Sequence, residues 1–368
     1  MFFILYGITG AVPLIAALYL LLRRSNAFVP DTTPPVRLRR WAAAFFAVAA
    51  LGHVWWLLFF ILSSDIRSAD DMFRSMGYVA TVTLDYVAML TTIAGTLLAM
   101  LQDRRRPVWP VLVAMIPIVI LGGVLMASPD EPLMLTADAY IVLFYVLFAV
   151  YVAFAVRQYG RWLRDNYADL ERKEVWLTHA LSLVFMLLLI LYALIGTDII
   201  LFYLLHVLEL ALFGLLLWRV ETLPTLQEET QVQKLSAPLP AREGQGGESL
   251  DHIDRLLKEH CVATQLYLQH DLSLQQLAQA VGTNRSYLSQ YFSRQGITYN
   301  TYINNLRINH FISRYEETVA ARLSVAARQL VHESGFSSYR TFSRAFTQRT
   351  GQSLKAWMSQ SAPPSFSP

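Results

Sequence analysis

Seven long apolar stretches occupy most of the first 220 residues and restrict what this chain can fold into. They cover residues 2–22, 41–62, 77–101, 107–127, 134–156, 175–195 and 198–218. A bilayer core about 30 Å thick requires about 20 apolar helical residues to cross it, and each stretch is that long. Membrane β-strands instead alternate apolar and polar residues over about 10 positions, whereas these stretches are continuously apolar. The pattern predicts seven transmembrane helices over residues 1–220.

The basic residues between these stretches predict how the helices are oriented. The loops on one side of the membrane carry 14 Lys and Arg residues, whereas the loops on the other side carry only Arg67 and Arg74. Cytoplasmic loops are enriched in basic residues, so the 14 should face the cytoplasm. This orientation puts the N-terminus outside the cell and the chain after residue 218 inside it. An odd number of spans requires the same arrangement.

Some ionisable residues lie inside the predicted spans, where charge is costly and usually faces a bundle interior or water. His206 and Glu209 are three residues apart, so they share one face of a helix. Together with His53 and Asp85 they are candidate residues for intramembrane sensing. In the alternative, they hydrogen-bond between helices and only hold the bundle together. Two histidines and two acids could also form a metal site or a proton path, but their spacing is specific for neither. The sequence therefore assigns no metal ligand and no cofactor.

The composition changes near residue 220. Residues 221–249 are rich in Pro, Gly, Gln and Ser and lack apolar periodicity, which is typical of a flexible linker. From Leu250 to the end there are 12 Lys and Arg but 7 Asp and Glu residues, a net charge of +5 in a chain of net charge +3. A basic excess confined to this part favours a polyanionic partner. We expect a soluble domain over residues 250–360 and a disordered tail over residues 361–368.

Residues 273–292 have the pattern of two short helices joined by a tight turn. Ser273 and Gln276 have the spacing of a capping box at the start of a helix. Apolar residues at helical spacing follow them, and Gly282 is the type of residue that ends a helix in a turn. Leu288 and Phe292 are four apart and form the buried face of the second helix. The stretch is predicted to be a helix-turn-helix.

The same pattern recurs about 54 residues later in the chain. Four residues of the second copy match the first in kind: Leu330, Gly335, Phe342 and Phe346 correspond to Leu277, Gly282, Leu288 and Phe292. Residues 298–315, between the copies, have helical periodicity. Two copies joined by a helix are much stronger evidence for helix-turn-helix units than one copy would be.

With these repeats, the chain resembles the AraC/XylS family of bacterial transcription regulators over residues 250–358. The residues that carry the resemblance are DLSLQQLAQAVGTNRSYLSQYF, the LRI at residues 306–308, and SGFSSYRTFSRAFTQRTGQS at residues 334–353. The resemblance implies two helix-turn-helix units joined by a linker helix, with RNA polymerase as a partner. The membrane half is similar to multi-span variants of the family, which implies the bacterial inner (cytoplasmic) membrane. The expected fold is therefore all-α, with a seven-helix transmembrane bundle followed by this domain.

The second helix of each unit should enter the major groove of DNA with its exposed residues on base edges. Because the apolar residues of each helix face inward, the opposite face holds the candidate DNA-binding residues. Arg can contact guanine and Gln can contact adenine in a bidentate way. Arg307, Arg314, Arg322 and Arg349 are further candidates for phosphate contacts. The predicted base-contacting set is Arg285, Ser286, Ser289, Gln290, Tyr339, Arg340, Ser343 and Arg344.

These features together predict a membrane-bound one-component transcription regulator without enzymatic activity. Its expected partners are double-stranded DNA, the lipid bilayer and a small-molecule or membrane-derived signal, and a homodimer is left open. Two alternatives also stay open: a membrane-anchored scaffold whose helical tail binds protein, and an intramembrane enzyme or transporter with a regulatory tail. An enzyme or transporter would need a catalytic pair or broken helices, and Asp85 with Glu209 is the candidate pair.

Overall fold

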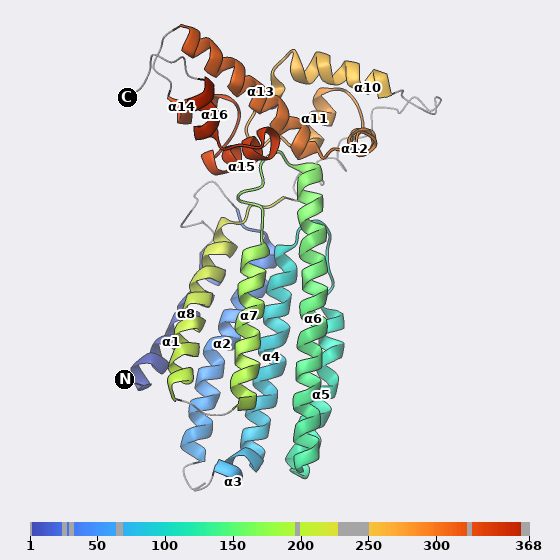
Figure 1. The fold of residues 1–368 in the computed structure, drawn as a ribbon. Helices are drawn as coiled ribbons and strands as arrows, with labels where there is room; N and C mark the ends of the chain where they lie inside the picture. Colours follow the sequence, from blue (N-terminus) through green and yellow to red (C-terminus); the bar gives the residue numbers. More distant parts are fainter. Residues whose placement is uncertain are drawn as a thin grey trace, which may run out of the picture. The chain divides into compact units, whose positions relative to one another are not determined.

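The computed structural model describes residues 2–23, 28, 33–63, 69–195, 199–226, 250–321 and 326–361 of the 368-residue chain. Its regular elements in these ranges are all helical, in agreement with the predicted class. The chain divides into two compact units, whose helices are labelled in Figure 1. The first unit contains Met1–Tyr159 and Val175–Gln227, and the second contains Gly160–Glu174 and Glu228–Pro368. The short segment Gly160–Glu174 thus belongs to the second unit, although the chain on both sides of it belongs to the first.

The first unit is a bundle of long helices. α1 packs against α2 and α8, α2 against α4, α4 against α5, and α7 against α8. The hydroxyl groups of Tyr140 and Tyr145 on α6 donate to backbone carbonyls of α5 and α7, at 2.8 and 2.9 Å. The helices are α1 (Phe2–Leu22), α2 (Val36–Leu62), α3 (Ala69–Arg74), α4 (Met76–Met100), α5 (Trp109–Ala127), α6 (Glu131–Asn166), α7 (Trp176–Ile195) and α8 (Ile199–Thr222).

The surface of this bundle exposes many large apolar side chains. A soluble protein rarely exposes contiguous apolar patches larger than a few hundred Å². Helices satisfy their own backbone hydrogen bonds, which is what a hydrocarbon environment requires. The surface therefore fits a lipid environment. Examples from the long helices are Ile15, Ile61, Leu84, Ile120, Phe154, Val184 and Leu204.

Six of these helices are long and apolar enough to cross a membrane. They are Ile4–Leu22, Val36–Leu62, Met76–Met100, Trp109–Ala127, Glu131–Asn166 and Tyr203–Thr222. In α7 the apolar stretch Trp176–Leu191 is shorter than the usual length of a span. A helix is present at each of the seven predicted places, while the number of seven membrane crossings stays a prediction.

α2 begins five residues before the predicted span 41–62, at Val36, and α6 begins three residues before the predicted span 134–156, at Glu131. Two helices also run past the C-terminal ends of their predicted spans, because the polar residues that follow are packed. α6 runs ten residues beyond residue 156, since Val152, Tyr159 and Leu163 form a buried stripe at helical spacing. α8 continues to Thr222, and the chain after it is also held: the backbone N–H of Leu226 donates to the side-chain oxygen of Gln102. The start of the predicted linker therefore packs on the first unit, while residues 227–249 lie outside the described residues. Of the predicted tail 361–368, Ser361 ends α16 and residues 362–368 lie outside the described residues.

The second unit contains short helices around two apolar cores. One core forms around α10, α11 and α12 and includes Leu277, Leu288 and Phe292. The other forms around α14, α15 and α16 and includes Leu330, Phe342 and Phe346. The central helix α13 contributes to both. The elements are α10 (Leu250–Leu257), η1 (Lys258–Val262), η2 (Leu266–Leu268), α11 (Leu274–Ala280), α12 (Arg285–Arg294), α13 (Tyr299–Ala320), α14 (Ala327–Glu333), α15 (Tyr339–Thr350) and α16 (Leu354–Ser361).

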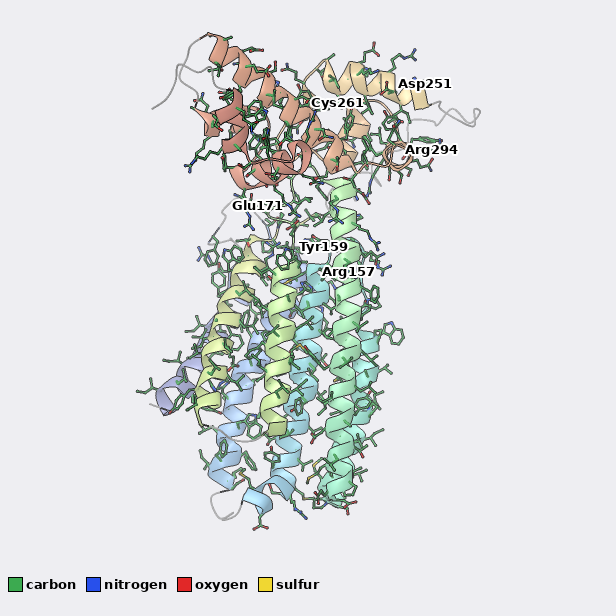
Figure 2. All side chains as sticks on the ribbon, viewed as in Figure 1. Arg157, Tyr159, Glu171, Asp251, Cys261 and Arg294 are labelled. Atoms are coloured by element: carbon green, nitrogen blue, oxygen red, sulfur yellow. The ribbon has the colours of Figure 1, made fainter. Side chains whose placement is uncertain are left out.

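Cys261, labelled in Figure 2, is fully buried in the first of these cores. Burial raises the pKa of its thiol to about 11, so little reactive thiolate is present at neutral pH. We expect the folded protein to react with iodoacetamide at pH 8 on the order of 100-fold more slowly than the urea-unfolded protein. A second thiol introduced by Ser293→Cys, at an exposed position of α12, should react quickly in the same folded protein. Equal labelling rates at the two cysteines, followed by mass spectrometry, would contradict this burial.

Candidate nucleic-acid interface

The first helix-turn-helix is built from α11 and α12. Ser273 caps α11 in a reciprocal box with Gln276, as the sequence predicts, with the two hydrogen bonds at 2.9 and 3.2 Å. Gly282 has a φ of +71°, a left-handed conformation that favours glycine in the turn between the helices. The side chain of Asn284 accepts from the backbone N–H of Ser286 at 2.8 Å and so begins α12.

The second helix-turn-helix is built from α14 and α15 with the same plan. Gly335 has a φ of +85°, and a Cβ atom there would lie 2.8 Å from the backbone of Leu268. The glycine therefore serves both the turn and the close packing of η2. Ser338 caps α15 by accepting from the backbone N–H of Thr341, whereas Ala326 gives α14 no side-chain cap.

Arg307 on α13 does not lie where a phosphate could reach it, contrary to the sequence prediction. Its side chain is 1% exposed and donates to the backbone carbonyls of Tyr267 and Gln269, at 2.7 Å each. Its guanidinium also stacks over the ring of Phe336 at 5.6 Å. Because Phe336 belongs to the second core, Arg307 joins the two helix-turn-helix units. Sequence reasoning missed this role because a buried arginine and an exposed one look alike along a helix.

The other three arginines proposed for phosphate contacts differ among themselves. Arg314 forms an exposed ion pair with Glu317 at 2.8 Å on α13. Arg349 donates to the backbone carbonyl of Asn305 and to the side chain of Asn309, which ties α15 to α13. Arg322 lies outside the described residues. Arg349 therefore has a structural role in addition to its charge.

The predicted base-contacting residues of α12 lie opposite its buried face. Leu288 and Phe292 are buried, and Ser286, Ser289 and Gln290 are exposed, as the helical spacing predicts. Arg285, by contrast, is only partly exposed, because its guanidinium donates to the side-chain oxygen of Asn166 at 2.5 and 3.1 Å.

The predicted residues of α15 form one continuous surface. Tyr339, Arg340 and Arg344 are exposed and Ser343 is partly exposed, while Phe342 and Phe346 are buried beneath them. A shallow hollow runs along this face, and its lining contains all four predicted residues together with Thr347 and Gln348. The face presents two guanidinium groups, a phenol, hydroxyls and an amide, which are the groups that read base edges and phosphates.

The segment Gly160–Glu174 packs onto this second unit. Ala168 is fully buried in the first core, and its backbone N–H donates to the carbonyl of Leu272 at 3.3 Å. The side chain of Asn300 donates to the carbonyl of Ala168 at 2.6 Å, and Lys173 forms an ion pair with Asp271 at 3.0 Å. The sequence contained no signal for this packing, because the segment resembles any basic loop between two spans.

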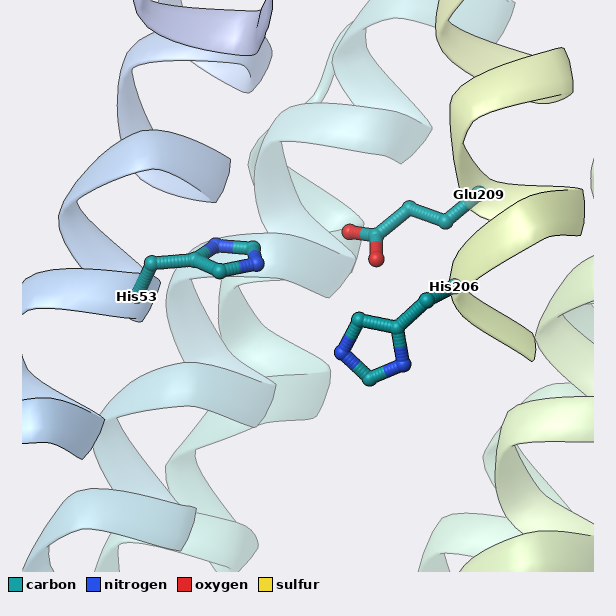
Figure 3. Close-up of side chains that lie close together, drawn as sticks. All are labelled: His53, His206 and Glu209. Carbon is teal, nitrogen blue, oxygen red and sulfur yellow. The ribbon is translucent and has the colours of Figure 1, made fainter. Parts of the chain in front are cut away.

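The four residues proposed for intramembrane sensing lie in the first unit on three helices. His53 is on α2, Asp85 is on α4, and His206 and Glu209 are on α8. The structure brings His53, His206 and Glu209 together, with one ligating atom of each within 4.8 Å of the others (Figure 3). Asp85 lies against Gly52, the residue before His53, and its carboxylate is 3.4 Å from the indole nitrogen of Trp56. Spacing along the chain could not reveal this group, since its members come from distant helices.

Comparison with known proteins agrees with the geometry of the second unit. The model of a family described as a helix-turn-helix domain matches residues 261–360. An uncharacterised HTH-type transcriptional regulator of Staphylococcus aureus (strain COL) is 29% identical over 108 residues. That match covers 28% of this chain but only 13% of the relative's length. No solved structure matches the chain.

The matched residues 261–360 contain both helix-turn-helix units and the helix between them. The helical bundle of the first compact unit, residues 1–159 and 175–227, lies outside this match. Over residues 261–360 the chain is therefore a helix-turn-helix domain of the AraC type.

Proposed function

We propose that this protein is a membrane-bound one-component transcription regulator that binds double-stranded DNA sequence-specifically. The observation that carries the proposal is the pair of similar units. In both, the second helix buries an apolar face against α13 or its core and exposes polar and basic side chains. Two such helices on one rigid domain suit two successive stretches of the major groove.

Base recognition would come from the exposed faces of α12 and α15. Arg340 and Arg344 can each contact guanine O6 and N7 in a bidentate way, and Gln290 can do so with adenine N6 and N7. Ser286, Ser289, Ser343 and Tyr339 complete the two faces with hydroxyl groups. Arg285 would join them once its guanidinium leaves Asn166. The net charge of +5 after Leu250 would supply general attraction to phosphate.

The first unit would be the sensor and the membrane anchor. In this proposal α7 is a seventh span, the membrane is the bacterial inner membrane, and the second unit lies in the cytoplasm. The group around His53, His206 and Glu209 would receive the signal. RNA polymerase and a second copy of the chain are further proposed partners, by resemblance to the family. The proposal assigns no catalytic residue. The alternative of a membrane-anchored scaffold would leave the similar polar and basic faces of α12 and α15 without a role.

The proposed role in DNA recognition is tested at Arg344, whose side chain is 77% exposed on α15. Arg344→Ala should lower the affinity of the full chain for its operator by about 10- to 100-fold, since a bidentate arginine–guanine contact is lost. Affinity for random duplex should change much less, because one phosphate contact at most disappears. The measurement is fluorescence anisotropy of the detergent-solubilised protein with both duplexes at two salt concentrations.

Lys258→Ala is a matched control for that experiment. It removes the same charge from η1, where Lys258 forms an exposed ion pair with Asp254 at 2.7 Å. The control should keep operator affinity. Unchanged operator affinity in Arg344→Ala, in a protein with native circular dichroism, would count against the proposed reading helix.

A further prediction concerns orientation in the membrane. Because basic residues favour the cytoplasmic side, the chain after Thr222 should be cytoplasmic and the N-terminus external. A fluorescent protein fused after Pro368 should fold and fluoresce, and alkaline phosphatase fused after Pro129, between α5 and α6, should be active outside. A tag at the N-terminus should be accessible to protease in intact spheroplasts. If both ends proved to lie on the same side, the number of spans would be even and the orientation argument would fail.

A further inference from the structure

The polar group in the first unit lies where α1, α2 and α8 meet. The ring of Tyr6, on α1, lies 4.9 Å from the ring of His53 and 6.4 Å from the ring of His206. The two histidine rings are 6.5 Å apart and nearly perpendicular. Figure 3 shows His53 pointing from α2 toward His206 and Glu209, which both extend from α8. Two imidazoles and a carboxylate therefore converge between helices that are far apart in the chain.

The hydrogen bonds of His53 prepare one of its nitrogens for a ligand. Nδ1 is 2.9 Å from the backbone carbonyl of Ala49, so this nitrogen carries the proton and donates it. Histidines that bind metals almost always donate their other N–H in this way, which fixes the ring. Nε2 then presents its lone pair beside the hydroxyl of Thr9 at 2.9 Å. Thr9 can donate instead to the carbonyls of Leu5 and Tyr6, so it keeps a partner when Nε2 binds elsewhere.

The charges near this group favour a divalent cation. Glu209 is one of the three converging residues, and the nearby Asp85 adds a second carboxylate. Two carboxylates at membrane depth are costly unless their charge is compensated. One divalent ion would balance both charges. Three protein ligands would also leave a coordination position open, as in zinc sites that exchange a ligand.

We propose that His53, His206 and Glu209 bind a divalent transition-metal ion of the Zn²⁺ type. Imidazole nitrogens suit zinc and its neighbours, and a single carboxylate completes a common three-ligand set. The ion would be the signal, or part of it, and this meaning rests on the proposed sensing function of the first unit. The binding of the ion itself does not depend on DNA.

The test uses the full chain in nanodiscs without DNA. Zn²⁺ content after dialysis should approach one ion per chain, and Co²⁺ should give the visible absorption of a site with low coordination number. Glu209→Gln and His206→Ala should each weaken Co²⁺ binding at least about tenfold. Asp138→Asn on α6 and His260→Ala on η1 remove the same types of group elsewhere and should bind like the native chain.

Glu209→Gln nearly preserves shape, so a folding failure is not expected, and gel filtration with circular dichroism checks each variant. Less than a tenth of an ion per chain would overturn the metal site, and so would equal binding by native chain and both ligand variants. Failure of DNA binding would leave this result untouched, so the two proposals are tested separately.

A second inference comes from the segment Gly160–Glu174, independently of the metal site. This segment contacts one predicted DNA-binding residue in each helix-turn-helix, Arg285 in the first and Arg344 in the second. The side-chain oxygen of Asn166 accepts two hydrogen bonds from Arg285. The carboxylate of Glu171 accepts from the hydroxyl of Thr341 at 3.3 Å, and that of Glu174 is 3.7 Å from the guanidinium of Arg344. One short segment therefore contacts the beginning of α12 and the exposed face of α15.

The acceptor groups of this segment are of the same kinds that DNA offers: a neutral oxygen, like those on base edges, and negatively charged oxygens, like those of phosphates. An amide oxygen and two carboxylates occupy guanidinium and hydroxyl groups that base acceptors and phosphates would otherwise engage. Phosphates cannot approach the carboxylates without repulsion, so DNA and the segment compete for the same surface. The segment is held on the second unit by Ala168, which is buried in the core around α10, α11 and α12.

We infer that residues 166–174 hold the domain in an inhibited state with respect to DNA. Each polar contact is weak alone: Arg344 is exposed, and exposed ion pairs contribute little. Together they should lower DNA affinity about tenfold, the effect of one charged hydrogen bond. Binding would then require the acidic residues of the segment to move away from the two reading helices.

The test measures DNA affinity of the full chain in nanodiscs by fluorescence anisotropy. The triple variant Asn166→Ala, Glu171→Gln, Glu174→Gln should bind duplex about tenfold more tightly than the native chain. Asn166→Asp should do the opposite, because a carboxylate beside Arg285 strengthens the competing contact. Asp165→Asn is the matched control: it removes an exposed carboxylate of the same segment and should change affinity by less than about twofold.

Two results would overturn the inference: equal affinity in the triple variant and the native chain, or an equal gain in Asp165→Asn. The second result would show a general charge effect. If no variant binds duplex at low salt, the proposed DNA-binding function fails as well, and that outcome differs from equal but measurable binding.

Discussion

The absence of water in a bilayer core is the constraint on which the first unit depends. Backbone groups there must find partners within the chain, and helices provide them. Polar side chains obey the same rule: the hydroxyl of Tyr6 donates to the carbonyl of His53, and His179 contacts the carbonyls of Val175 and Leu97. Such hydrogen bonds hold neighbouring helices together. The group of His53, His206 and Glu209 differs because it brings three side chains that could bind a metal ion to one point.

In the second unit, a buried charge connects two apolar cores. Arg307 satisfies two backbone carbonyls and stacks on Phe336, so a single guanidinium joins the two cores around α13. Removal of one partner of such a group would leave buried carbonyls without a donor, which costs more than the hydrogen bonds themselves contribute. This joint holds the cores of α12 and α15 together in one compact unit, and a fixed spacing between these helices is what the proposed groove recognition needs.

The segment Gly160–Glu174 links the two proposals for regulation. It is covalently continuous with α6 and α7, yet its residues pack in the second unit. A signal can shift an equilibrium only by binding one state more tightly than the other. A metal ion that favours one arrangement of α2 and α8 would have to act on α6 or α7 to reach this segment. The packing of α7 against α8, and of α6 against α7 through Tyr145, provides a physical connection.

The sequence alone determined the helical class, the position of each long helix and the two helix-turn-helix units. Hydrophobic length and periodicity are local properties, and so are the caps at Ser273 and Asn284. The exposed set Ser286, Ser289 and Gln290 also follows from local periodicity. Only the tertiary structure decided that Arg307 is buried, that His53 meets His206 and Glu209, and that Asn166 contacts Arg285. Each of these joins residues that are distant in the chain, and the spacing of residues along a chain carries no information about such contacts.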